Sequence, residues 1–159
     1  MKCPKCRSKT LRKDRVPVSR EVAGHVFSTS LPGLRCAGCA ESQVSLRDLE
    51  RFELLVANVL GTLGASTGPV FKFQRKALGL QAAELAELLD ASVETVSRWE
   101  NGKRDIPRSA LAVLATLVED AAGMRTDTAA KLRALSKPRR IPKRVQLNFA
   151  SGEAEPRAS

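Results

Sequence analysis

The feature that most constrains the fold is a set of four cysteines in two closely spaced pairs. The pairs are Cys3-Pro-Lys-Cys6 and Cys36-Ala-Gly-Cys39. A two-residue spacer lets both thiolates of a pair turn toward one ion, and two such pairs supply the four ligands of a closed structural zinc site. The two ends of the intervening segment must then meet at one point. Because no coordination position is left open, we expect the metal to support folding rather than catalysis.

Two other chemistries use the same cysteine spacing. Two disulfides need an oxidising compartment, and the N-terminus "MKCPKCRSKT" lacks the apolar core of a secretory signal. A thioredoxin-like redox pair needs a βαβ unit, which residues 1–45 are too short and too strand-like to provide. The single histidine, His25, has no partner at ligand spacing. We therefore favour one structural Zn²⁺ per chain, held by Cys3, Cys6, Cys36 and Cys39.

The segment between the cysteine pairs has the pattern of strands. Its sequence "VPVSREVAGHVFSTSLPGL" alternates apolar and polar residues around Gly24, with a second turn signal at Pro32-Gly33. This pattern predicts a small β-hairpin or meander that carries one cysteine pair at each end. Residues 1–45 are accordingly interpreted as a zinc ribbon.

Helical spacing replaces the alternation after Ser45, which can cap a helix start. The apolar stripe comprises Leu46, Leu49, Phe52, Val56, Val59, Leu60 and Leu63. Glycines and Gly68-Pro69 then interrupt it, so residues 46–68 are predicted to be a connecting helix and linker. The apolar face of this helix packs either within the chain or against a second copy. No apolar run reaches the roughly 20 residues that cross a bilayer.

Residues 69–136 are predicted to form a helical domain with short breaks between helices. The segment "AAELAELL" has one apolar stripe and is followed by the turn "DAS". Ser92 can cap the next helix, "VETVSRWE", and Asn101-Gly102 can end it. Two short helices joined by a tight turn form a helix-turn-helix.

The second of these helices has two distinct faces. Val96 and Trp99 are three residues apart and are predicted to face inward. Glu94 and Arg98 are four residues apart and share the opposite, exposed face. The inner face can hold the helix on the bundle while the outer face enters a major groove.

The segment "LQAAELAELLDASVETVSRWENGKRDIP" resembles the phage-repressor-like (Xre-type) helix-turn-helix regulators, over residues 70–122. With the cysteine pairs, the chain resembles MqsA-type (YgiT-type zinc-finger) antitoxins and their stand-alone regulator relatives. The resemblance implies a mainly α fold with a small N-terminal β zinc ribbon and a repressor-like helix-turn-helix bundle on the C-terminal side. It also implies a cytoplasmic prokaryotic repressor, associated with the nucleoid when bound. Such a protein is a homodimer on a palindromic double-stranded DNA operator, with a toxin as possible partner of the ribbon.

In that family the start and outer face of the second motif helix read base edges. Carried over by position, the readers are Ser92, Val93, Glu94, Thr95 and Arg98, with Ser97 as a further candidate. Arg98 can donate two hydrogen bonds to a guanine edge, Glu94 can accept one from a cytosine amine, and Val93 can contact a thymine methyl. Glu94 has a second interpretation, as a solvated carboxylate that stabilises the helix N-terminus.

The remaining positions divide into phosphate contacts and structure. Four basic residues are interpreted as phosphate contacts, which fix register without choosing sequence: Lys72, Lys76, Lys103 and Arg104. Arg75 and Glu100 occupy positions that the family joins in a buried ion pair. One departure is Gln81-Ala82, where the family has Thr-Gln, because Ala82 cannot make the glutamine's phosphate contact.

The formal net charge of +10 favours an anionic partner, but the charge is concentrated at the chain ends. Residues 1–20 hold eight basic and one acidic residue, whereas residues 69–122 hold seven basic and eight acidic residues. The segment "TDTAAKLRALS" is expected to be a last helix that packs Leu132 and Leu135. Residues 137–159 are predicted to be a basic disordered tail that enters a minor groove or remains solvated.

Three functional classes are compatible with a chain of this size. A sequence-specific DNA-binding regulator is favoured, and a zinc-stabilised protein-interaction adaptor without sequence-specific DNA binding is the alternative. An enzyme is disfavoured because the only histidine is isolated and the cysteines are assigned to metal.

Overall fold

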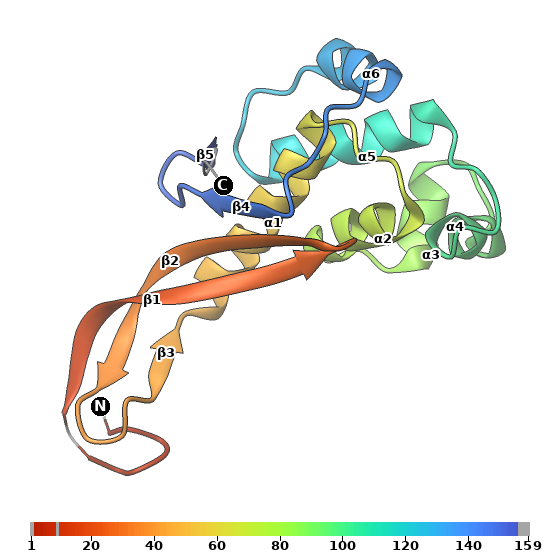
Figure 1. Ribbon diagram of the computed structural model, residues 1–159. Helices are drawn as coiled ribbons and strands as arrows, with labels where there is room; N and C mark the ends of the chain where they lie inside the picture. Colours follow the sequence, from red (N-terminus) through yellow and green to blue (C-terminus); the bar gives the residue numbers. More distant parts are fainter. Residues whose placement is uncertain (1, 9, 156–159) are drawn as a thin grey trace.

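Figure 1 shows a computed structural model that describes residues 2–8 and 10–155. Within these residues the strands are β1 (Leu11–Val22), β2 (His25–Cys36), β3 (Ser42–Val44), β4 (Arg144–Leu147) and β5 (Ala154–Glu155). The helices of the described part are α1 (Leu46–Thr62), α2 (Gly68–Ala77), α3 (Ala82–Leu88), α4 (Val93–Glu100), α5 (Arg108–Ala121) and α6 (Thr128–Ser136). The predicted fold class, mainly α with a small sheet at the N-terminal side, is confirmed. None of these helices is long and apolar enough to cross a membrane.

The N-terminal strands form one long hairpin. β1 and β2 pair antiparallel along their whole length, from Leu11 opposite Cys36 to Val22 opposite His25. The turn residues Ala23 and Gly24 both have positive φ, 50° and 81°, which is the backbone of a two-residue hairpin turn. Twelve residues per strand give an arm of roughly 40 Å. Figure 1 shows the turn end beside α2 and the cysteine end projecting away from the helices. The predicted hairpin around Gly24 is confirmed.

The turn predicted at Pro32-Gly33 is wrong. Both residues lie inside β2. Pro32 falls between the part of β2 that pairs with β4 and the part that pairs with β3, which begins at Gly33. A proline is tolerated there because no neighbouring strand needs its N–H on that side. At Gly33 the backbone of β3 approaches so closely that a Cβ would lie 2.3 Å from the Gln43 carbonyl oxygen.

The C-terminal segment differs from the disordered tail that was predicted for residues 137–159. β4 pairs parallel with β2, and β5 folds back on β4. Val145 and Leu147 are buried, and the Thr29 hydroxyl donates to the Leu147 carbonyl at 2.9 Å. The physical reason is that "VQL" alternates two apolar residues around a polar one and extends the sheet beyond β2. Residues 156–159 of the predicted tail lie outside the described residues.

Two hydrophobic cores hold the described residues together. One joins the turn half of the hairpin to α1, the start of α2 and β4, and its buried members include Phe27, Leu31, Phe52, Leu60 and Val145. The other lies among the helix-turn-helix elements and includes Phe71, Leu85, Val96, Trp99 and Leu114. The boundary predicted at residue 45 therefore does not separate two cores. Half of the hairpin packs with the helices, and only its cysteine end lies apart.

A buried charged residue, Lys131, links α6 to two other helices. Lys131 donates to the Glu119 carboxylate at 2.7 Å and to the Thr62 hydroxyl at 2.9 Å, which ties α6 to both α5 and α1. Of the two leucines predicted to pack, Leu135 contacts the helix-turn-helix core, but Leu132 stays exposed.

Candidate metal centre and nucleic-acid interface

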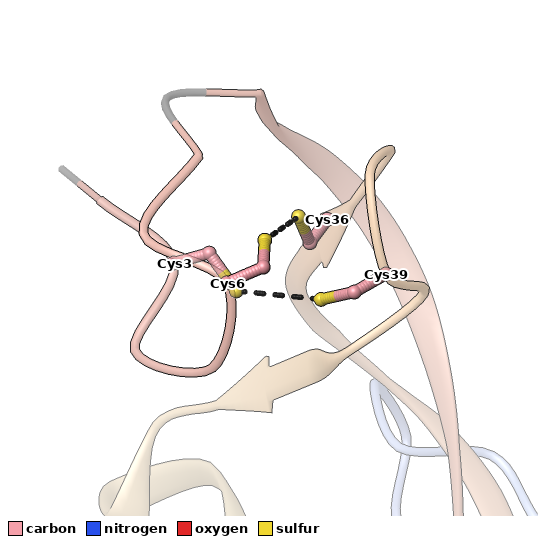
Figure 2. Close-up of side chains that lie close together, drawn as sticks. All are labelled: Cys3, Cys6, Cys36 and Cys39. Atoms are coloured by element: carbon pink, nitrogen blue, oxygen red, sulfur yellow. Dashed lines mark hydrogen bonds between the residues drawn. The ribbon is translucent and has the colours of Figure 1, made fainter.

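The four cysteines lie together at the projecting end of the hairpin. Figure 2 shows their side chains pointing toward one another, Cys3 and Cys6 from the N-terminal loop, Cys36 from the end of β2 and Cys39 from the loop that follows it. The Sγ atoms of Cys3 and Cys39 are 3.6 Å apart, those of Cys6 and Cys36 are also 3.6 Å apart, and all four lie within 4.8 Å of one another. A disulfide needs about 2 Å, whereas four thiolates about 2.3 Å from one zinc ion are roughly 3.8 Å apart. The cluster therefore fits a single metal ion.

Both cysteine pairs adopt the same backbone arrangement. The N–H of the residue after the second cysteine donates to the carbonyl of the first, from Arg7 to Cys3 at 2.8 Å and from Ala40 to Cys36 at 2.9 Å. Arg7 and Ala40 have the same φ of 58°. This repeated tight turn brings the two thiols of each pair to one side. Because the turn is local, the two-residue spacing of the cysteines was enough to predict that both thiols of a pair face one ion.

The electrostatics of the cluster favour a cation. The backbone N–H of Gly38, with help from that of Cys39, lowers the pKa of the Cys36 thiol to about 6 against the opposing effect of burial. At Cys39 the backbone N–H of Glu41 favours the thiolate, but burial and the neighbouring sulfurs prevail and raise its pKa to about 12. Four thiolates cannot share one site without compensation, and a bound divalent cation supplies it.

Removal of a metal ion from the four cysteines is expected to loosen the cysteine end without unfolding the helices, because the turn half of the hairpin shares a hydrophobic core with α1, α2 and β4 that does not include the cysteines. Chelation should shift or broaden the backbone NMR signals of residues 2–8 and 34–42. The thermal unfolding of the helices, followed by circular dichroism at constant pH, should hardly change. Collapse of the helical signals on chelation would contradict this division.

Caps fix both ends of α4, and one of its faces is buried. The Ser92 hydroxyl accepts from the Thr95 N–H at 3.1 Å and caps the helix start. Gly102, with φ of 66°, takes the left-handed conformation that ends it. Val96 and Trp99 are 0% and 5% exposed. The indole packs edge-to-face on Phe71, with ring centroids 6.0 Å apart.

The opposite face of α4 is open to solvent. The predicted base readers Ser92, Val93, Glu94 and Arg98 are exposed, as is Ser97, while Thr95 is half-buried. The Thr95 hydroxyl lies 3.0 Å from that of Ser92, so it takes part in the cap. Among the described residues neither Glu94 nor Arg98 forms a salt bridge. The Glu94 carboxylate and the Arg98 guanidinium are therefore available to a partner.

A buried ion pair fixes the end of α4 against α2. Arg75 donates to both carboxylate oxygens of Glu100, at 2.5 and 3.1 Å, and to the Leu80 carbonyl at 2.7 Å. The two side chains are 8% and 6% exposed. Gly68, at the start of α2, lies so close that a Cβ would be 2.5 Å from the Trp99 carbonyl oxygen.

The residues predicted to contact phosphates lie on two neighbouring elements. Lys72 and Lys76 are on α2, where they line a hollow with Arg20 of the hairpin. Lys103 and Arg104 are exposed in the loop after α4. At the start of α3, the Glu84 carboxylate accepts from the Gln81 N–H at 2.6 Å, so this helix keeps a cap despite the atypical Gln81-Ala82 pair.

Residues 71–117 match the family model described as helix-turn-helix. The matched segment spans nearly all of α2, then α3, α4 and most of α5. The match supports a DNA-binding regulator. No curated protein matches the chain. The hairpin, α1 and the C-terminal strands lie outside the matched segment.

Sequence reasoning missed the polar groups buried between α1, α5 and α6. Lys131, Glu119 and Asn58 are all buried. The only signal was the position of Asn58 within an otherwise apolar run of α1.

Proposed function

We propose that this protein is a sequence-specific transcriptional regulator that reads the DNA major groove with α4. The observation that carries the proposal is the contrast between the two faces of this helix. Val96 and Trp99 are buried behind it, whereas Glu94 and Arg98 are exposed and unpaired within the described residues. Arg98 donates two hydrogen bonds to a guanine edge, and Glu94 accepts from a cytosine amine.

The base contacts proposed at Ser92, Val93 and Thr95 surround the start of the same helix. Val93 is 45% exposed and presents methyl groups suited to a thymine methyl. Lys72, Lys76, Lys103 and Arg104 then bind phosphates and set the register of α4 in the groove. The Arg75–Glu100 pair holds α4 in place and makes no DNA contact.

We further propose that the protein acts as a homodimeric repressor on a palindromic operator. A single short helix contacts only a few base pairs, so two copies are needed for a site of useful specificity. Their recognition helices would lie about 34–36 Å apart, one turn of B-DNA.

The cysteine end binds one structural Zn²⁺ through Cys3, Cys6, Cys36 and Cys39. The ion would fix the two loops to each other and complete the end of the hairpin. Because this end projects from the helices (Figure 1), a protein bound there need not block α4. We propose that the partner is a toxin, which would make this protein an antitoxin.

Binding to a duplex selected from a random-sequence pool tests the proposal. The full chain is expected to bind the selected duplex well above a scrambled one. The logarithm of its affinity should fall linearly with the logarithm of salt concentration, by about 0.9 per phosphate neutralised. Fluorescence anisotropy across a salt series measures both. If no sequence is enriched and the affinity is insensitive to salt, the adaptor alternative holds instead.

A further inference from the structure

Two close thiol contacts in the cysteine cluster each join an accessible cysteine to a buried one. Cys6 is exposed, and its Sγ lies 3.6 Å from that of Cys36, which is 1% exposed. Cys39 is half-buried, and its Sγ lies 3.6 Å from that of Cys3, which is also 1% exposed. Oxidation-sensitive cysteines often have this arrangement, in which one sulfur meets the oxidant and a neighbouring sulfur resolves the product.

Both contacts connect the same two parts of the chain. Cys3 and Cys6 lie in the N-terminal loop, whereas Cys36 ends β2 and Cys39 lies in the loop that follows it. Neither hydrophobic core of the described residues contains a cysteine, so core packing does not hold these loops against a small shift. Because a disulfide bond is about 2 Å long, each pair of sulfurs has to approach by only roughly 1.5 Å to form one.

We propose that the cysteine cluster is a redox switch that exchanges its metal ion for two disulfide bonds, Cys6–Cys36 and Cys3–Cys39. The oxidant is a peroxide. This inference rests on the proposed Zn²⁺ site and does not depend on DNA binding. The two disulfides link the same loops that the metal ion links, so the end of the hairpin stays closed in both states.

Each disulfide forms in two steps and consumes one peroxide, which takes two electrons from one pair of thiolates. Hydrogen peroxide first oxidises the accessible Cys6 thiolate to a sulfenic acid and releases hydroxide. The Cys36 thiolate then attacks the Cys6 sulfur, the S–S bond forms, and a second hydroxide leaves. A second peroxide reacts in the same way at Cys39 and Cys3, and the metal ion has then lost all four ligands.

The exchange changes the charge of the projecting end. Four thiolates with one Zn²⁺ carry two negative charges, whereas two disulfides carry none. The other charged side chains of residues 2–8 and 34–42 are Lys2, Lys5, Arg7, Arg35 and Glu41. Oxidation therefore makes an already basic end more positive, which alters its attraction to a charged partner. In a reducing compartment the disulfide form persists only while the oxidant does.

Peroxide titration of the zinc-loaded full chain tests the proposal, with the zinc content measured first by atomic absorption. About two equivalents of hydrogen peroxide are expected to release the Zn²⁺ to a chromogenic chelator. The protein mass should then be about 4 Da below that of the reduced metal-free chain, for the four hydrogens lost. Dithiothreitol with Zn²⁺ should reverse both changes. Zinc that stays bound and thiols that stay reduced in excess peroxide would overturn the proposal.

Peptide mapping without reduction identifies the disulfides. Trypsin cuts after Lys5 and separates Cys3 from Cys6, whereas Cys36 and Cys39 remain in one peptide. The proposed disulfides hold these three peptides together, and fragmentation between Cys36 and Cys39 assigns the pairs. Disulfides within each sequence pair, disulfides between chains, or sulfinic acids in place of disulfides would contradict the switch.

Two single variants each keep one of the contacts. After peroxide, Cys3→Ser is expected to contain the Cys6–Cys36 disulfide and a free Cys39 thiol, and Cys6→Ser the Cys3–Cys39 disulfide and a free Cys36 thiol. Alkylation with iodoacetamide and mass spectrometry identify the free thiol, and a different free thiol in either variant refutes the pairing. A wild-type chain that binds no zinc would refute the metal site alone, because the disulfides are mapped independently of the metal.

Discussion

Replacing Glu100 with alanine is expected to destabilise the helix-turn-helix bundle by about 3–5 kcal/mol, because it leaves a buried guanidinium without its partner. Arg75 is 8% exposed, and two of its three hydrogen-bond contacts are to the Glu100 carboxylate. The remaining contact, to the Leu80 carbonyl, cannot balance the charge. Urea unfolding of the full chain, followed by circular dichroism, measures the loss.

Two further variants show whether the loss comes from the unpaired charge. Glu87→Ala removes an exposed carboxylate from α3 and should change stability by no more than about 0.5 kcal/mol. The double change Arg75→Met with Glu100→Leu removes both charges and should recover much of the stability. If Glu100→Ala costs no more than Glu87→Ala, the pair does not hold α4 in place.

The parts of the site that could be predicted from the sequence are those encoded locally. Ser92 caps α4 and Asn101-Gly102 ends it because both signals act within one turn of the helix. The inward positions of Val96 and Trp99 follow from helical spacing. The cysteine cluster was predictable for a similar reason, because each pair forms a local turn and four thiols at this spacing suit one tetrahedral ion.

The parts that were missed depend on contacts between distant segments. β4 is short, and its two apolar residues lie beyond the basic run that dominates "KPRRIPKRVQL", so composition favoured disorder. Its stability comes from β2, more than a hundred residues earlier in the chain. Pro32-Gly33 has the composition of a turn, and only the positions of β3 and β4 explain why it lies inside a strand. The burial of Lys131 likewise needs Glu119 and Thr62 on two other helices.

The proposed function depends most on Arg98. Its guanidinium is exposed on the outer face of α4 and has no carboxylate partner among the described residues. One bidentate contact to a guanine contributes about 1–3 kcal/mol of discrimination. Removing it should therefore reduce preference for the correct sequence more than it reduces general attraction to DNA. Residues 69–122 hold nearly equal numbers of basic and acidic residues. The positions of individual charged side chains therefore matter more for DNA binding by this segment than its net charge.

The most direct test is the ratio of affinities for the selected duplex and a scrambled duplex, measured by fluorescence anisotropy at one salt concentration. Arg98→Ala is expected to lower this ratio by about 5- to 150-fold. Arg125→Ala, which removes an exposed charge from the loop between α5 and α6, should leave it unchanged. A folded Arg98→Ala protein that keeps the wild-type ratio would contradict the claim that α4 reads base edges.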